Sequence, residues 1–233
     1  DNEEINLRDT CRALAGNLDK YIIDNTVVAV SWGNTLNCLA GQIQPLKAKD
    51  IKVVQLNGGV AKSASSTGAS QIVDALTMAG HGIGYMFPVP AIVDSKHTSE
   101  ILQEETQVKN VLRLAKEAEV SIFSIGALSK DSILYEVEYL KDEDFQALEK
   151  NKAVGDIASR YFDINGNIAL KELDDRVVGF GLEELREKEW TIAIAVGVNK
   201  VDAIIGALRA GFMNVLYTDE KTAREILNRN LLG

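Results

Sequence analysis

Short apolar segments alternate with amphipathic ones along most of this chain, and this alternation constrains the fold more than any other feature. Near-continuous apolar runs such as 26–30, 51–56 and 120–124 are typical of strands that are buried on both faces. Between these runs, apolar residues recur at spacings of three and four, which predicts helices. Strands that alternate with helices form a mainly parallel sheet covered on both sides. The sequence therefore predicts a doubly wound α/β fold.

The predicted elements share these two patterns and follow one another with short, turn-rich connections. The expected strands are 26–30, 51–56, 83–87, 120–124, 190–196 and 214–217. The expected helices are 1–25, 35–43, 69–79, 98–104, 106–118, one that begins near Lys200, and one that Thr218 caps and that extends to about 228.

The segment 127–189, called the insertion below, interrupts this rhythm. It contains a polar helix near 142–150 and a hairpin signal at Ile164–Gly166. We interpret it as an insertion into one domain, serving as a lid or an assembly surface.

Charge and cysteine content exclude several classes of protein. Lys and Arg number 25 against 34 Asp and Glu, which gives a net charge of -9 with no basic block, so this chain by itself should not bind DNA or RNA. Cys11 and Cys38 provide no disulfide framework, and no apolar run is long enough to span a bilayer. These features favour a reduced, cytoplasmic setting.

Four loops that follow predicted strands are rich in glycine or small polar residues. Ligands of parallel sheets bind beyond the carboxyl ends of the strands, and glycine lets the backbone approach a ligand closely. Each loop alone could be an ordinary tight turn, but together they predict a binding site. The four loops are Ser31–Thr35, Asn57–Gly59, Ser124–Gly126 and Gly197–Lys200.

Individual residues in and near these loops allow two interpretations each. Lys200 lies in the first turn of a predicted helix, where it either binds an anion or is simply solvated. Asn34 and Thr35 cap the helix that they begin or donate to a phosphate, and the two roles are compatible. Asp156 accepts hydroxyl groups of a polyol or is an ordinary first-turn helix acid.

No catalytic constellation can be identified from the residues. Gly80–Gly84 lacks the spacing of a dinucleotide fingerprint, and there is no phosphate-loop or nucleophile-elbow motif. Neither His81 nor His97 occurs in a pattern that ties it to a nucleophile.

Several short motifs, taken together and in order, nevertheless resemble one family. They are SWGNTL at 31–36, VQLNGG at 54–59, AVGDI at 153–157 with RYFD at 160–163, NK at 199–200 with IGAL at 205–208, and NVL at 214–216 with TD at 218–219. These motifs resemble the sugar-binding domain of SorC-type bacterial transcription regulators over about residues 26–226.

This resemblance implies a fold similar to that of sugar-phosphate isomerases and deaminases, in a protein that binds a phosphorylated sugar and is not an enzyme. No cofactor is expected. DNA would be bound only by a helix-turn-helix domain that this sequence lacks. Residues 1–25 would then be a connecting helix, and 26–233 the effector domain of a cytoplasmic homodimer or homotetramer whose assembly or geometry controls operator binding.

The resemblance also implies roles for individual residues. The turn at Gly33, Asn34 and Thr35 would form a phosphate clamp with Lys200, and Asp156 would accept sugar hydroxyls. Some members carry Lys where Asn57 stands, and because only Lys could form an imine with an aldehyde, Asn57 predicts non-covalent binding. The backbone walls of the site would be Gly58, Gly59, Ile125 and Gly126.

Two other functions remain open from the sequence. A sugar-phosphate isomerase or deaminase would need a general base, for which Asp156 is the candidate, but no matched acid is evident. An oligomerisation module with an empty pocket is the third possibility.

Overall fold

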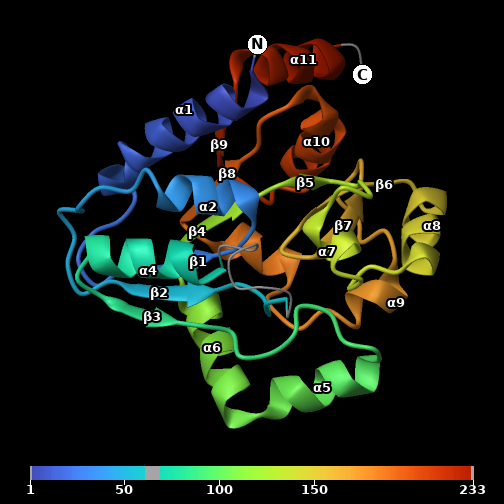
Figure 1. Ribbon diagram of the computed structural model, residues 1–233, viewed down its shortest axis with the longest axis horizontal. Coiled ribbons are helices and arrows are strands. Elements are labelled where there is room, and N and C mark those ends of the chain that lie inside the picture. The colour runs from blue at the N-terminus through green and yellow to red at the C-terminus, as the bar shows by residue number, and fades with distance from the viewer. Residues whose placement is uncertain (1, 61–68, 232–233) are drawn as a thin grey trace.

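A six-stranded parallel sheet forms the centre of the molecule in the computed structural model, which describes residues 2–60 and 69–231 (Figure 1). Its strand order is β3-β2-β1-β4-β8-β9, so the chain first extends the sheet on one side of β1 and then on the other. The order therefore reverses between β1 and β4, which is where ligands of open α/β sheets bind. The strands are β1 (Val27–Val30), β2 (Lys52–Gln55), β3 (Ile83–Tyr85), β4 (Val120–Ser124), β8 (Trp190–Ile194) and β9 (Val215–Tyr217).

Helices cover both faces of this sheet, and the pleat of β1 shows why the strands are so apolar. Val28 and Val30 pack into one core cluster with α1 and α2, whereas Ala29 packs into the other with α6 and α10. All three side chains are fully buried. The helices are α1 (Glu3–Ala15), α2 (Asn34–Ala40), α4 (Ala69–Ala79), α5 (Lys96–Glu104), α6 (Thr106–Glu117), α10 (Val201–Arg209) and α11 (Glu220–Leu231).

Two of the helices end earlier than the sequence predicts. The predicted helix 1–25 is wrong, because α1 ends at Ala15 before Gly16 and a separate 3-10 turn follows at Leu18–Lys20. Leu18 continues the apolar spacing because it still faces the core. In the same way, α2 ends before Gly41 and does not continue to 43.

The predicted cap of the last helix is also wrong by one residue. A carboxylate oxygen of Asp219 accepts a hydrogen bond from the Thr222 backbone N–H at 3.0 Å, so Asp219 and not Thr218 caps α11.

The insertion forms a unit with its own small core. Its antiparallel sheet has the order β5-β6-β7, and a turn at Gly166 (φ 80°) follows β7 as the hairpin signal predicts. Leu134, Phe145 and Leu148 are buried with Leu173 in a third core cluster. The elements are β5 (Gly126–Ala127), α7 (Ile133–Glu136), α8 (Asp142–Lys150), β6 (Ala153–Ile157), β7 (Arg160–Asp163), α9 (Lys171–Asp174) and the 3-10 helix η2 (Leu182–Glu187).

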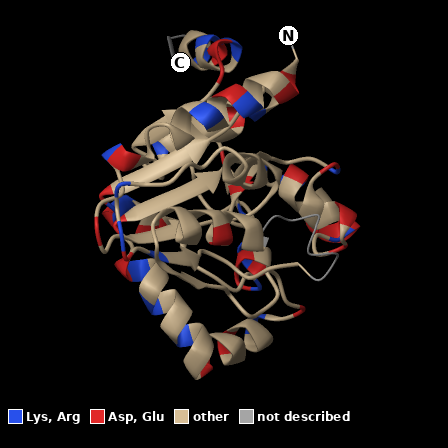
Figure 2. Cartoon of the chain, turned by 60° about the vertical axis from the view of Figure 1, so that its left-hand side comes forward, with Lys and Arg blue, Asp and Glu red and all other residues tan. Residues whose placement is uncertain are grey.

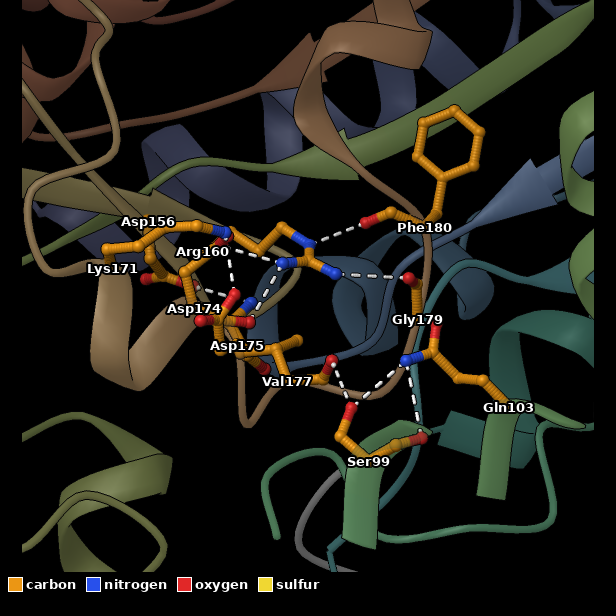
Figure 3. Close-up of polar contacts among 11 residues, drawn as sticks. Ser99, Gln103, Asp156, Arg160, Lys171, Asp174, Asp175, Val177, Gly179 and Phe180 are labelled. Carbon is orange, nitrogen blue, oxygen red and sulfur yellow. Dashed lines mark hydrogen bonds and ion pairs between the residues drawn. The ribbon is translucent and has the colours of Figure 1, made fainter. Parts of the chain in front are cut away.

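Arg160 of β7 holds residues 174–180 of the same insertion in place. Its guanidinium donates to the carbonyl oxygens of Phe180 (2.7 Å) and Gly179 (3.1 Å) and to the carboxylate of Asp174 (2.6 Å) (Figure 3). The segment that it holds pairs in turn with the chain after β2, since Phe180 N–H donates to Leu56 and Gly58 N–H donates to the carbonyl of residue 178. This arrangement places β6 and β7 beside the carboxyl ends of the parallel strands.

Lys and Arg positions are intermixed with Asp and Glu positions along the elements drawn in Figure 2, in agreement with the absence of a basic block in the sequence. In the part of the chain that the structure describes, every helix is too short or too polar to cross a bilayer.

Candidate functional site

A cavity of about 310 Å³ opens at the carboxyl ends of β1, β2, β4 and β8, where β6 and its turn form the opposite wall. It lies at the reversal of strand order described above. Eight of the described residues that line it carry hydroxyl or amide groups, which suit the hydrogen-bonding capacity of a polyol. These groups belong to Ser31, Asn34, Asn57, Ser124, Ser129, Ser132, Ser159 and Asn199.

Asp156 supplies a carboxylate from β6. It pairs with Gly126 of β5, where a Cβ atom would collide with the Asp156 carboxylate, so the glycine is required to make room for it. Burial raises the pKa of Asp156 to about 6, although the Ser159 N–H bond and nearby Lys200 favour the ionised form. Asp156 thus lies on a strand, and its interpretation as a first-turn helix acid is wrong.

The tight turn between β6 and β7 holds this carboxylate in place. Its two residues, Ala158 (φ 51°) and Ser159 (φ 69°), both adopt the left-handed conformation that non-glycine residues disfavour. As a result the Ser159 N–H points back and donates to Asp156 at 3.1 Å. The strained backbone of Ala158 and Ser159 therefore helps to fix the position of the Asp156 carboxylate in the cavity.

Asn57 lies at the end of β2 and contacts this turn. Its side-chain N–H₂ donates to Ser159 Oγ at 3.0 Å, and its side chain is 1% exposed. Asn57 lines the cavity, and its buried Oδ1 atom has no hydrogen-bond partner among the described residues. An unpaired buried carbonyl oxygen costs about 1–3 kcal/mol, which a ligand hydroxyl would recover.

Lys200 is the one Lys or Arg among the described residues that line the cavity. It ends the 3-10 turn η3 (Val198–Lys200) and stands at the N-cap of α10. Burial lowers the pKa of Lys200, while the charges of Glu3 and Asp156 act in the opposite direction. An anion here would gain both the lysine charge and the field of α10.

The loop that carries Lys200 is fixed by α11. Gly197 has φ 112°, which favours glycine, and its N–H donates to Thr222 Oγ1 (3.0 Å) and to Asp219 (3.2 Å). The position of Lys200 therefore depends on a hydrogen-bonded loop and not on the cavity contents.

The beginning of α2 decides between the two roles suggested for Asn34 and Thr35. Gly33 (φ 128°) is the N-cap, no side chain caps the helix, and both residues belong to its first turn. The interpretation of Asn34 and Thr35 as caps is therefore wrong. Asn34 lines the cavity, but Thr35 is buried and its carbonyl accepts a contact from Cys11 Sγ at 3.7 Å.

The structure brings together six of the ten residues that the sequence singles out. Gly33, Asn34, Asn57, Gly126, Asp156 and Lys200 line the cavity, whereas Thr35, Gly58, Gly59 and Ile125 do not.

Gly58 and Ile125 have structural reasons for their residue type. A Cβ atom at Gly58 would overlap the Pro90 carbonyl, and the Gly58 carbonyl accepts from Trp32 Nε1 at 2.8 Å. Ile125 is fully buried in the main core. Trp32 both packs in this way and lines the cavity.

Sequence reasoning singled out Asp156 of the insertion but missed the serines of the same wall. Ser129, Ser132 and Ser159 line the cavity although no motif singles them out as ligand-binding. The polar run 129–132, which follows the apolar segment 125–128, is the only sequence signal that could have found two of them.

Metal chemistry finds no support in the side chains. In residues 2–60 and 69–231, no group of three or more His, Cys, Asp or Glu side chains could hold a metal ion.

Comparison with known proteins gives concordant results. The family described as "Putative sugar-binding domain" matches residues 1–228. The chain is 33% identical over 220 residues to the deoxyribonucleoside regulator of Bacillus subtilis, covering 94% of this chain and 70% of that protein. It is 31% identical over 208 residues to the transcriptional regulator LsrR of Escherichia coli K12, covering 86% and 62% of the two chains. The chain thus spans roughly two thirds of these regulators.

Solved structures of regulators share the fold. A transcriptional regulator from Streptococcus pneumoniae matches with a TM-score of 0.91 and 26% identity, over 99% of this chain and 88% of that one. The full-length sorbitol operon regulator SorC of Klebsiella pneumoniae matches with a TM-score of 0.89 and 21% identity, over 97% and 73% of the two chains. With a family match over nearly its whole length and a cavity rich in hydroxyl and amide groups, the chain belongs to the sugar-binding domain family of SorC-type transcriptional regulators.

Proposed function

We propose that this chain is an effector domain that binds a phosphorylated sugar non-covalently in the cavity at the β1–β4 reversal. In the complete regulator, which acts in the cytoplasm, the occupied domain changes the oligomeric state or geometry of the assembly and thereby the affinity for an operator. Operator DNA is contacted by a helix-turn-helix domain outside this sequence, to which residues 1–25 connect. A homodimer or homotetramer is the expected assembly.

The observation that carries this proposal is that Asn57, whose buried Oδ1 atom has no hydrogen-bond partner among the described residues, lines the cavity together with Lys200 and the carboxylates of Asp131 and Asp156. A sugar hydroxyl can donate to Asn57 Oδ1, and Asp156 can accept from another hydroxyl. Lys200, the first turn of α2 and the start of α10 are left for an anionic group, which the phosphate supplies.

Thermal unfolding with a panel of sugars tests the proposal. A phosphorylated sugar at about 100 times its dissociation constant should add roughly 2.7 kcal/mol of stability, which raises Tm by several degrees. The unphosphorylated form of the same sugar should have a much smaller effect.

Lys200→Ala should weaken binding of the phosphorylated sugar by about 10- to 100-fold, because it removes a charge-assisted contact of roughly 1.5–3 kcal/mol. Lys221→Ala, which removes an exposed lysine outside the cavity lining, is the matched control and should bind as the wild type does. Equal binding by the two variants would contradict the phosphate clamp.

Isomerase or deaminase chemistry is a second candidate function, favoured by the raised pKa of Asp156, which at about 6 would suit a general base. His81 and His97 lie outside the cavity lining, so neither supplies the acid that this chemistry needs. We therefore expect no conversion of aldose phosphates to ketose phosphates, followed by NMR. Turnover that disappeared in Asp156→Asn would establish the enzyme instead.

A further inference from the structure

The first turn of α1 reaches the loop that carries Lys200. Gly197 has no side chain, and Glu3 Oε1 lies 2.7 Å from the position that a Cβ atom of Gly197 would occupy. The Glu3 carboxylate therefore packs directly on the backbone of this loop. Glycine at 197 permits both the positive φ of the loop and the approach of a carboxylate from a helix nearly 200 residues earlier in the sequence.

This carboxylate also acts on the lysine. Burial lowers the pKa of Lys200, and the charges of Glu3 and of Asp156 on the cavity wall partly offset this effect because both favour the protonated form. Lys200 thus has two carboxylates in its neighbourhood, one on the cavity lining and one on α1. Glu3 lies outside the described lining of the cavity, so its charge acts on an anion at Lys200 from behind the loop.

The chain from α1 onward also contacts the beginning of α2 and the strand β9. Cys11 Sγ contacts the carbonyl of Thr35 in the first turn of α2, and beyond the helix the hydroxyl groups of Tyr21 and Tyr217 lie 3.2 Å apart. Figures 1 and 2 both show α1 on the outside of the sheet with its beginning close to α11. α1 therefore bridges the two helix beginnings that face the cavity.

We propose that Glu3 is an intramolecular competitor for the anion-binding end of the cavity, so that effector binding and docking of the first turn of α1 oppose each other. The inference rests on the proposed function, since it names a regulation of the same site. Linkage makes the effect reciprocal: the factor by which docked Glu3 weakens the effector is the factor by which the effector loosens Glu3. Effector binding in the cavity would in this way change how firmly the first turn of α1 is docked.

Titration with inorganic phosphate, followed by NMR at constant ionic strength, tests this inference. Glu3→Gln should bind phosphate about two- to fivefold more tightly than the wild type, the range expected for one exposed charge pair. Glu4→Gln is the matched control, because Glu4 lies next to Glu3 in the same helical turn and its substitution changes the net charge equally. It should bind phosphate as the wild type does.

A second measurement separates competition from a general effect on the helix. Phosphate should speed amide exchange in the first turn of α1 of the wild type, and Lys200→Ala should abolish this response. Phosphate binding with equal affinity in Glu3→Gln and wild type would overturn the inference and leave the proposed function standing. Absence of any phosphate or sugar-phosphate binding in the wild type and in Glu3→Gln would overturn both.

Discussion

The parallel-sheet body and the insertion contribute opposite ends of the same cavity, and they are held in place by different combinations of forces. Lys200 and the first turn of α2 follow strands whose residues, such as Ile192 of β8, are fully buried among aliphatic side chains. The insertion, which carries Asp156 and Ser159, is buried in the main core through residues such as Phe162, and directional polar contacts are added to this burial. Apolar burial tolerates small displacements, whereas hydrogen bonds to a buried guanidinium do not.

Two arginines provide these polar attachments. Arg160 and its partner Asp174 have side chains only 10% and 12% exposed. Arg176 donates to the carbonyl of Val93 in the body at 2.9 Å and pairs with Asp144 of α8. The hydroxyl-binding end of the site is therefore expected to be the more sensitive to substitution, and the anion-binding end the more robust.

Breaking the Arg160 attachment should have the largest effect. Arg160→Met leaves the Asp174 carboxylate and the carbonyls of Gly179 and Phe180 without their donor, so it should reduce the free energy of unfolding by about 3–5 kcal/mol. Urea unfolding measures this loss. Arg113→Met, which removes an exposed pair with Glu117, is the control and should cost less than about 1 kcal/mol. Similar losses in the two variants would refute the contrast between body and insertion.

The pH dependence of stability should reveal Asp156 of the insertion. The pKa of Asp156 is about 6 in the folded protein, whereas the ordinary value of 3.8 applies to the unfolded chain. Between about pH 4 and pH 6 the folded protein therefore keeps a proton on Asp156 that the unfolded chain releases. The free energy of unfolding therefore decreases as the pH rises through this window, by about 3 kcal/mol at most from this group.

The difference between wild type and Asp156→Asn isolates this contribution from other carboxyl groups. Binding of an unphosphorylated sugar should strengthen as the pH rises through about 6, the pKa of Asp156 in the folded protein, because ionised Asp156 is the better acceptor. A wild-type protein that titrates in parallel with Asp156→Asn would show that Asp156 ionises normally and is not desolvated.

Helix caps in the two regions offer the smallest and sharpest comparison. Ser95 caps α5 in the body, and Ser132 caps α7 in the insertion, where it also lines the cavity. Ser95→Ala should cost about 1 kcal/mol of stability without changing sugar binding. Ser132→Ala should weaken sugar binding as well. Calorimetric titration distinguishes the two, and an effect of Ser95→Ala on affinity would count against the assignment of the cavity.

The elements of the body were predictable because their patterns are long and local. Continuous apolar residues predict buried strands such as β4, and α4 and α8 begin and end where the spacing of apolar residues predicts. The boundaries that failed lie where the core contacts continue past the helix, as at Leu18. Apolar spacing reports which residues face the core, and this can persist after the helical hydrogen bonds have ended.

The candidate site was predictable mainly on the side of the body. Asn57 and Lys200 follow strands of a parallel sheet, and topology alone places such residues at one edge. Ser159 and Ser132 reach the cavity through contacts of the insertion that arise from distant parts of the chain, including the Asn57 bond to Ser159. No local pattern encodes those contacts. In the insertion, the motif resemblance singled out Asp156, which lines the cavity from β6 and does not begin a helix.

The left-handed pair Ala158 and Ser159 has a consequence for how the domain responds to its effector. Two non-glycine residues in this conformation are held by the hydrogen bonds of Ser159 to Asp156 and Asn57, so the wall is rigid before any ligand arrives. This wall therefore loses little conformational entropy when a ligand binds. Sugars that differ by the position of one hydroxyl should therefore be discriminated by mismatch against a fixed template, because the wall cannot readjust to them.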